Sequence, residues 1–148
     1  TPLYSSAASD VYKRQSMIGL DKRWLEPYGI DPDTAFVALI PYSGQVVTHF
    51  ERRRELGLPD TQPLVDDMAP LSYVRPDCRP MLILSGDRER EMLGLYEENV
   101  YFWRMMRVAG HPDVRICEFD GFDHGNMPQA GHFVAVRYIR EMERRMDR

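Results

Sequence analysis

The chain has 148 residues, of which 43% are hydrophobic and 28% charged, a composition typical of a folded globular domain rather than a disordered chain. Its formal net charge of −4 provides no basic surface, so nucleic acid and anionic membranes are not expected as partners. No apolar run approaches the roughly 18 residues that a membrane span requires, and the cysteines Cys78 and Cys117 are typical of buried thiols in a reducing compartment, so we expect a cytoplasmic protein.

The first fifteen residues, TPLYSSAASDVYKRQ, have neither the alternation of a strand nor the apolar stripe of a helix. They resemble the stretch that recurs at the ends of translated environmental reads, where linker nucleotides are read as protein. We therefore expect residues 1–15 to be a non-native or disordered leader. Residues 16–148 are expected to form the C-terminal part of a single domain.

The first half of this domain predicts one buried strand within irregular chain. Residues 20–25 have the pattern of the tail of a helix, and the apolar run over 35–40 is typical of a strand buried on both faces of a parallel sheet. A charged, helical stretch is expected over 45–57. The connection over 58–80 is rich in proline, which excludes long helices.

The second half alternates strands and helices. Residues 81–84 and 114–119 predict two further buried strands, and the helix between them is expected over 91–109, ending at Gly110. A final helix is expected to begin at Pro128. The chain therefore predicts an α/β fold with three parallel strands flanked by helices.

Each of the last two strands ends in a glycine loop that carries titratable residues. Gly86 is followed by Asp87 and Glu89, and His124 lies between Gly121 and Gly125. The carboxyl ends of parallel strands are where such sheets place their chemistry. A histidine held there can act as general base toward a hydroxyl and then as acid toward a leaving group.

The sequence leaves the partner of His124 open. Asp87 and Glu89 are rival carboxylates, and both also suit the charged first turn of the helix that follows. Ser43 follows a strand, but Pro41 and Gln45 stand where a nucleophile turn needs small residues, so Ser43 is rejected as a nucleophile.

Two further inferences concern ligands. Tyr42 and the segment that begins at Val46 follow a strand end and could line an acyl or alcohol pocket. The histidines other than His124 lack the spacing of metal ligands, so no metal site is expected. No organic cofactor is expected either, since the acyl-transfer chemistry that the resemblance described next implies needs none.

Five phrases of the chain carry a resemblance to a known family. They lie at residues 29–33, 40–45, 82–89, 96–99 and 121–125. From about residue 20 onward the chain resembles the C-terminal half of bacterial serine esterases and lipases of the α/β-hydrolase fold, close to the hormone-sensitive-lipase-like carboxylesterases. In that pattern the acid comes third after the strand-end glycine and the histidine follows later, which implies Glu89 as acid, with Asp87 as alternative, and His124 as base.

The resemblance implies an ester hydrolase that forms an acyl-enzyme and acts on a small-molecule ester. The chain contains no Gly-x-Ser-x-Gly elbow, so we expect it to be truncated before its nucleophile and inactive alone. Two alternatives stay open. One is a non-catalytic α/β module that binds a small ligand or a partner, and the other is a peptidase or amidase of the same fold.

Overall fold

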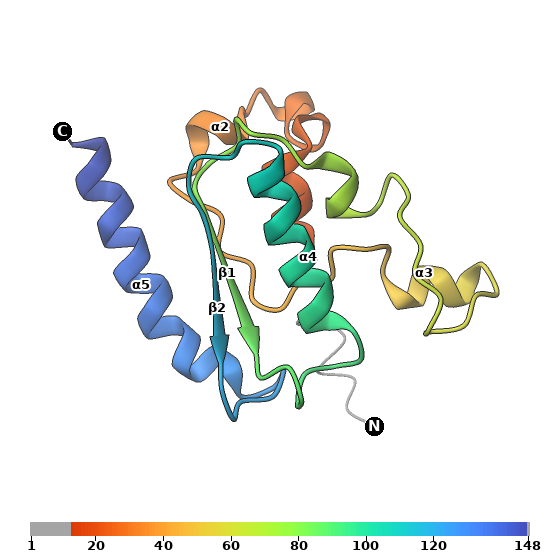
Figure 1. Ribbon diagram of the computed structural model, residues 1–148. Coiled ribbons are helices and arrows are strands. Elements are labelled where there is room, and N and C mark those ends of the chain that lie inside the picture. Colours follow the sequence, from red (N-terminus) through yellow and green to blue (C-terminus); the bar gives the residue numbers. More distant parts are fainter. Residues whose placement is uncertain (1–12, 148) are drawn as a thin grey trace.

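The computed structural model describes residues 13–147 and shows a small parallel sheet between two long helices (Figure 1). Strand β1, Met81–Gly86, pairs in parallel with strand β2, Val114–Phe119. Helix α4, Leu95–Val108, joins the two strands and packs on one face of the sheet, and helix α5, Met127–Met146, covers the other face. The expected α/β class, with parallel strands and flanking helices, is therefore confirmed.

The side chains of β1 divide between two hydrophobic cores. Met81 and Ile83 belong to the core beneath α4, whereas Leu82 and Leu84 belong to the core beneath α5. All four residues are at most 4% exposed. Because successive side chains of a strand point to opposite faces, a continuous apolar run is what a strand covered on both sides requires.

A third segment lies along the other edge of β1 and extends the sheet. Leu39 and Tyr42 form parallel bridges with β1, and the carbonyl of Pro41 accepts a hydrogen bond from it at 2.9 Å. The bounds of the strand expected over 35–40 are wrong, because its first residue belongs to the short helix α2, Pro32–Ala35. Proline has no N–H to give to the ladder, and the pairing is therefore interrupted within this segment.

The expected helices are present but begin and end at other residues. Helix α4 begins later than expected because Gly94, just before it, has a left-handed φ of 73°. The helix expected over 45–57 is reduced to the six residues of α3, Phe50–Glu55. The remaining helical elements are residues 13–20, η1 Lys22–Trp24, η2 Glu26–Tyr28 and η3 Pro70–Tyr73.

Part of the expected leader lies outside the described residues, namely residues 1–12, and residues 13–15 belong to the helical stretch 13–20. None of the helices in the described part of the chain combines the length and apolarity that crossing a bilayer requires. Within residues 13–147 there is also no cluster of three histidine, cysteine, aspartate or glutamate side chains suited to a metal ion.

Candidate active site

The loops that follow β1 and β2 are joined to each other by Asp87. Its N–H donates to the carbonyl of Phe122 at 2.7 Å, and its carboxylate accepts from the N–H of Gly121 at 2.7 Å and from that of Glu89 at 2.8 Å. These backbone N–H groups, Gly121 first and then Glu89, lower the pKa of the Asp87 carboxyl below its ordinary value. Asp87 is therefore committed to bracing the two loops.

His124 and Glu91 meet above the carboxyl ends of the two strands. The distance from His124 Nδ1 to Glu91 Oε2 is 3.1 Å, and the two side chains are 7% and 1% exposed. Glu91 Oε2 also accepts from the N–H of Met92 at 2.9 Å. An imidazole and a carboxylate are thus brought together at the expected end of the sheet.

The carboxylate that reaches the imidazole is neither of the two named from the sequence. Glu89 is exposed, and Asp87 uses both of its carboxylate oxygens on backbone N–H groups. The N–H of Glu91 donates to the carbonyl of Asp87 at 2.8 Å, so residues 87–91 make one turn that returns Glu91 over the strand end. Counting three residues from the glycine assumes a shorter turn and therefore misses Glu91.

A sequence signal for Glu91 did exist. An aspartate whose side chain accepts the N–H two residues later is a common way to begin a turn, and Asp87 followed by Glu89 allows that arrangement. A helical turn that starts at Asp87 brings the fourth residue, Glu91, back over it. This reasoning would have given Asp87 the task of bracing the loop and Glu91 that of contacting His124.

The Glu91 carboxyl is held in its charged form by hydrogen bonds. Burial raises its pKa, but the hydrogen bonds from His124 and Ser43 lower it further than burial raises it, so that the pKa lies below the ordinary value of a glutamate. An ionised carboxylate at Nδ1 fixes the tautomer of the imidazole and stabilises its protonated form.

The second ring nitrogen of His124 is buried and has no partner among the described residues. The loop that carries the ring is ordered by Asp123, whose carboxylate accepts from the N–H groups of Gly125 at 2.9 Å and Asn126 at 3.0 Å. Since buried polar atoms are nearly always hydrogen-bonded, Nε2 is a position where a hydroxyl group or a ligand is expected to bind.

Ser43 contacts the carboxylate and not the imidazole. Its hydroxyl donates to Glu91 Oε1, and it accepts from the N–H of Gly86 at 3.2 Å. Ser43 is fully buried and has a φ of 43°, a left-handed conformation that costs about 1–3 kcal/mol in a residue other than glycine. The Ser43 hydroxyl therefore bonds to the acid of the pair, and its rejection as a nucleophile stays a prediction.

Tyr42 and Val46, expected to contact substrate, both lie in the hydrophobic cores. Tyr42 is 8% exposed, its ring is 5.5 Å from that of His132, and it packs on Gly131 of α5. Val46 is 2% exposed, belongs to the core beneath α4 and also lines a hollow beside that helix.

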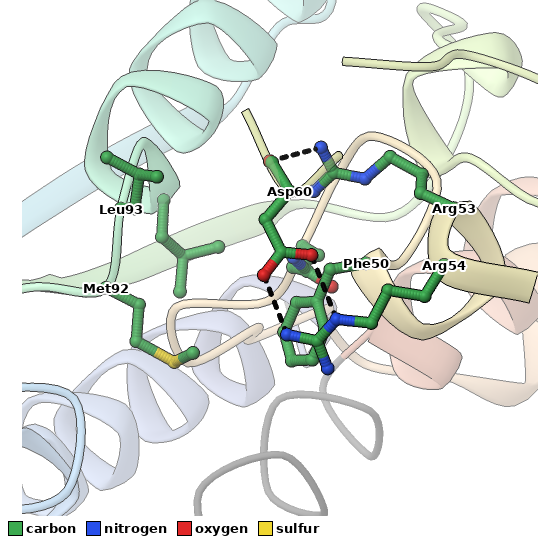
Figure 2. Close-up of a pocket in the computed structure, with 8 residues that line it drawn as sticks. Phe50, Arg53, Arg54, Asp60, Met92 and Leu93 are labelled. Carbon is green, nitrogen blue, oxygen red and sulfur yellow. Dashed lines mark hydrogen bonds and ion pairs between the residues drawn. The ribbon is translucent and has the colours of Figure 1, made fainter. Parts of the chain in front are cut away.

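A cavity of about 120 Å³ lies beside the residue that follows Glu91. Figure 2 shows Met92 and Leu93 on one side of it and Arg53 and Arg54 on the other, with Asp60 between the two arginines. Asp60 binds Arg54 through its carboxylate at 2.7 Å and Arg53 through its carbonyl at 2.8 Å. The cavity therefore has an apolar wall that includes Met92, the residue after Glu91 in the chain, and a charged wall opposite.

No protein-family model and no curated protein matches the chain. Solved structures are similar to it. One is Thermogutta terrifontis esterase 2 phosphoramylated by tabun, with a TM-score of 0.55 and 23% identity over 71% of this chain and 41% of that chain. The apo form of that esterase has a TM-score of 0.54 and 23% identity, over 71% and 42% of the two chains. Its propionate-bound form has a TM-score of 0.52 and 20% identity, over 71% and 42%.

The chain thus spans about two fifths of the length of these esterase chains. The similarity establishes the fold, which is a partial α/β-hydrolase fold.

Proposed function

We propose that this chain supplies the acid and the histidine of a Ser–Glu–His triad in an ester hydrolase that forms an acyl-enzyme. His124 is the general base and Glu91 is its orienting carboxylate. The nucleophilic serine and the donors that stabilise the oxyanion belong to a part of the protein outside this sequence. The observation that carries the proposal is the buried His124–Glu91 pair, whose Nε2 has no partner in the described part of the chain.

The chemistry follows from the two ring nitrogens. With Nδ1 bonded to Glu91, Nε2 is the atom that takes the proton of an attacking hydroxyl and later returns it to the alcohol that leaves. The second half-reaction uses Nε2 in the same way, with water in place of the serine hydroxyl. Glu91 stays ionised and balances the charge of the imidazolium in both steps.

We further propose that the substrate carries a short acyl or alcohol group. The cavity beside Met92 has a volume of about 120 Å³, which is the size of a cavity that takes a small group. One similar esterase was solved with propionate bound, which supports the same size class.

The test uses the full-length protein that contains these residues, with p-nitrophenyl acetate and butyrate as substrates. We expect turnover that His124→Ala lowers at least about 10³-fold. His132→Ala, a histidine exposed on α5, should retain the activity. Equal activity of both variants would contradict the proposal.

The isolated chain of 148 residues provides a second arm of the test. It should give neither a burst nor turnover of nitrophenol, because its own described serines do not contact His124 Nε2. Hydrolysis by this chain alone would contradict the assignment of the nucleophile to another segment. A full-length protein that binds esters without turning them over would favour a non-catalytic module.

A further inference from the structure

The carboxylate of Glu91 is anchored at both oxygens, and within residues 13–147 Ser43 provides the only side-chain anchor besides the imidazole. Oε2 accepts from Met92 N–H and faces His124 Nδ1. Oε1 accepts from the hydroxyl of Ser43 and from the N–H of Gly86, the latter at 3.2 Å. The Ser43 hydroxyl therefore lies on the opposite side of the carboxylate from the ring.

The direction of the Ser43 hydroxyl is set by its other contact. The N–H of Gly86 also points at Ser43 Oγ, at 3.2 Å. Because this oxygen accepts from the backbone, its own proton is available for Glu91. Gly86 makes the close approach possible, since a Cβ there would lie 2.8 Å from the carbonyl oxygen of Phe122 and 3.0 Å from Glu91 Oε1.

Helix α4 holds the backbone that presents Ser43. Asn99, which is fully buried, donates to the carbonyl of Gly44 at 3.0 Å. Glu98 accepts from the N–H groups of Val46 at 3.2 Å and Val47 at 3.4 Å. These contacts explain why the residues after Ser43 do not continue into a helix, and they stabilise a left-handed serine that its intrinsic preference disfavours.

Resting on the proposed function, we propose that Ser43 is a positioning residue of the hydrolase, whose hydroxyl fixes the Glu91 carboxylate so that its other oxygen stays aligned with His124 Nδ1. The hydrogen bonds of the Ser43 side chain go to Glu91 and to the N–H of Gly86, not to the imidazole. Ser43 acts on the imidazole only by fixing the Glu91 carboxylate. Helix α4 contributes by holding the backbone next to Ser43 in place. Such a role requires a buried hydroxyl that bonds to the carboxylate oxygen facing away from the imidazole, and Ser43 has this placement.

The variants are chosen to separate the hydroxyl from the backbone. Ser43→Gly suits the φ of 43° without strain and removes the donor, and Ser43→Cys keeps a weaker one. In the full-length protein we expect Ser43→Gly to lower kcat about 10- to 100-fold, the equivalent of one lost hydrogen bond to a charged group, with KM little changed. Ser43→Cys should retain an intermediate kcat.

The pH dependence gives a readout that a merely structural role would not move. His124 is the titratable group that contacts the Glu91 carboxylate. A carboxylate that has lost a donor attracts the imidazolium more strongly, so Ser43→Gly should move the acid limb of kcat/KM to higher pH. An unchanged limb together with an unchanged kcat would overturn the proposal.

Ser85 offers a matched control. It is also fully buried and lies on β1, but its hydroxyl has no hydrogen-bond partner among the described residues. Ser85→Ala should leave kcat and the pH profile unchanged. The same loss in Ser85→Ala as in Ser43→Gly would contradict a specific role for Ser43.

A double-mutant cycle tests whether Ser43 acts through Glu91. In a Glu91→Gln background, Ser43→Gly should cause less than about a twofold further loss. A full loss in both backgrounds would overturn the proposal. If His124→Ala is as active as the parent protein, the proposed function fails. If only His124→Ala loses activity, the positioning role alone fails.

The low-field proton resonance of His124 Nδ1–H needs no turnover. Ser43→Gly or, if that variant does not fold, Ser43→Cys should shift or broaden this resonance, and Ser85→Ala should not. A resonance that is identical in all variants would contradict the positioning role even in a protein without esterase activity.

Discussion

The pairing of His124 with Glu91 can be tested against Glu89, two residues earlier in the same loop. Glu91→Gln removes the charge that balances the imidazolium and leaves a side chain of the same size. We expect kcat for nitrophenyl ester hydrolysis by the full-length protein to fall on the order of 10³- to 10⁴-fold. Glu89→Gln, an exposed residue, is the matched control and should change kcat less than about twofold. The opposite ranking of the two variants would restore the sequence-based assignment.

At the scale of single residues, the sequence singled out His124, whereas the carboxylate that the structure brings to its ring, Glu91, was not among the two it named. His124 lies between glycines after an apolar run, and that signal is local. Which of Asp87, Glu89 and Glu91 reaches His124 depends on the turn that residues 87–91 adopt. The hydrogen bonds between Asp87 and the backbone of the loop after β2 fix this turn. Only the folded structure brings these groups together.

The packing of α5 on the sheet depends on a glycine. A Cβ at Gly131 would lie 2.8 Å from Cε1 of Tyr42, a rigid ring, and 3.4 Å from Leu84. Gly131→Ala gains up to about 1 kcal/mol in helix propensity but overpacks the core at a cost of about 1–3 kcal/mol. We expect a net loss of about 1–2 kcal/mol in the free energy of unfolding, measured by chemical denaturation.

A smaller side chain opposite Gly131 should remove the loss in the free energy of unfolding that Gly131→Ala causes. In a Tyr42→Leu background the added methyl group no longer meets an aromatic ring, so Gly131→Ala should be neutral or stabilising there. A loss of the same size in both backgrounds would show that the ring contact is not its cause.

The contact between α4 and the segment after Ser43 should depend on pH through Glu98. Burial raises the pKa of the Glu98 carboxyl, and the N–H groups of Val47 and Val46 only partly oppose this. For an acid whose pKa is raised on folding, the unfolded chain ionises first, so stability falls as pH rises through the interval between the two values.

Glu98→Gln keeps an oxygen for those N–H groups and removes the charge. The free energy of unfolding of this variant, relative to the parent protein, should therefore increase as pH rises above about 4.5 and then level off. Chemical denaturation of both proteins from pH 4 to 8 measures this difference in the free energy of unfolding. A difference that decreases with pH would contradict the direction of the shift.

At the scale of elements, the sequence predicted which stretches are strands and helices, and most errors arose where tertiary contacts override local preference. The helix expected over 45–57 is shortened because Glu98 and Asn99 bind the backbone of residues 44–47. Of the strand expected over 35–40, Leu39 pairs with β1, and the other pairing residue, Tyr42, lies beyond the expected range. No local pattern reports either contact.

The stability of the whole molecule in acid should depend on the ion pair between Arg88 and Glu118, which links the loop after β1 to β2. The hydrogen bond from Arg88 lowers the pKa of the Glu118 carboxyl to about 2. A carboxyl with a depressed pKa contributes stability that is complete above its unfolded value, about 4.3, and is lost as pH falls toward the folded value.

Arg88→Met should return the Glu118 pKa toward the ordinary value, as carboxyl carbon NMR titration would measure. The parent protein should be more stable than the variant near neutral pH, and the difference should decrease as pH falls from about 4.5 to about 2. Because Arg88 is exposed, the difference should also decrease in high salt. A difference that grows in acid would contradict the role of the pair.

The bonds of Asp87 to Gly121 and Phe122 have a consequence for motion across the molecule. Two hydrogen bonds of 2.7 Å join the loop that carries Glu91 to the loop that carries His124, so the two loops cannot separate independently. The amide protons of the two loops should therefore exchange with deuterated solvent through one shared opening event. We expect similar protection from exchange at Asp87 and Gly121. Loosening either loop would thus release both groups at once.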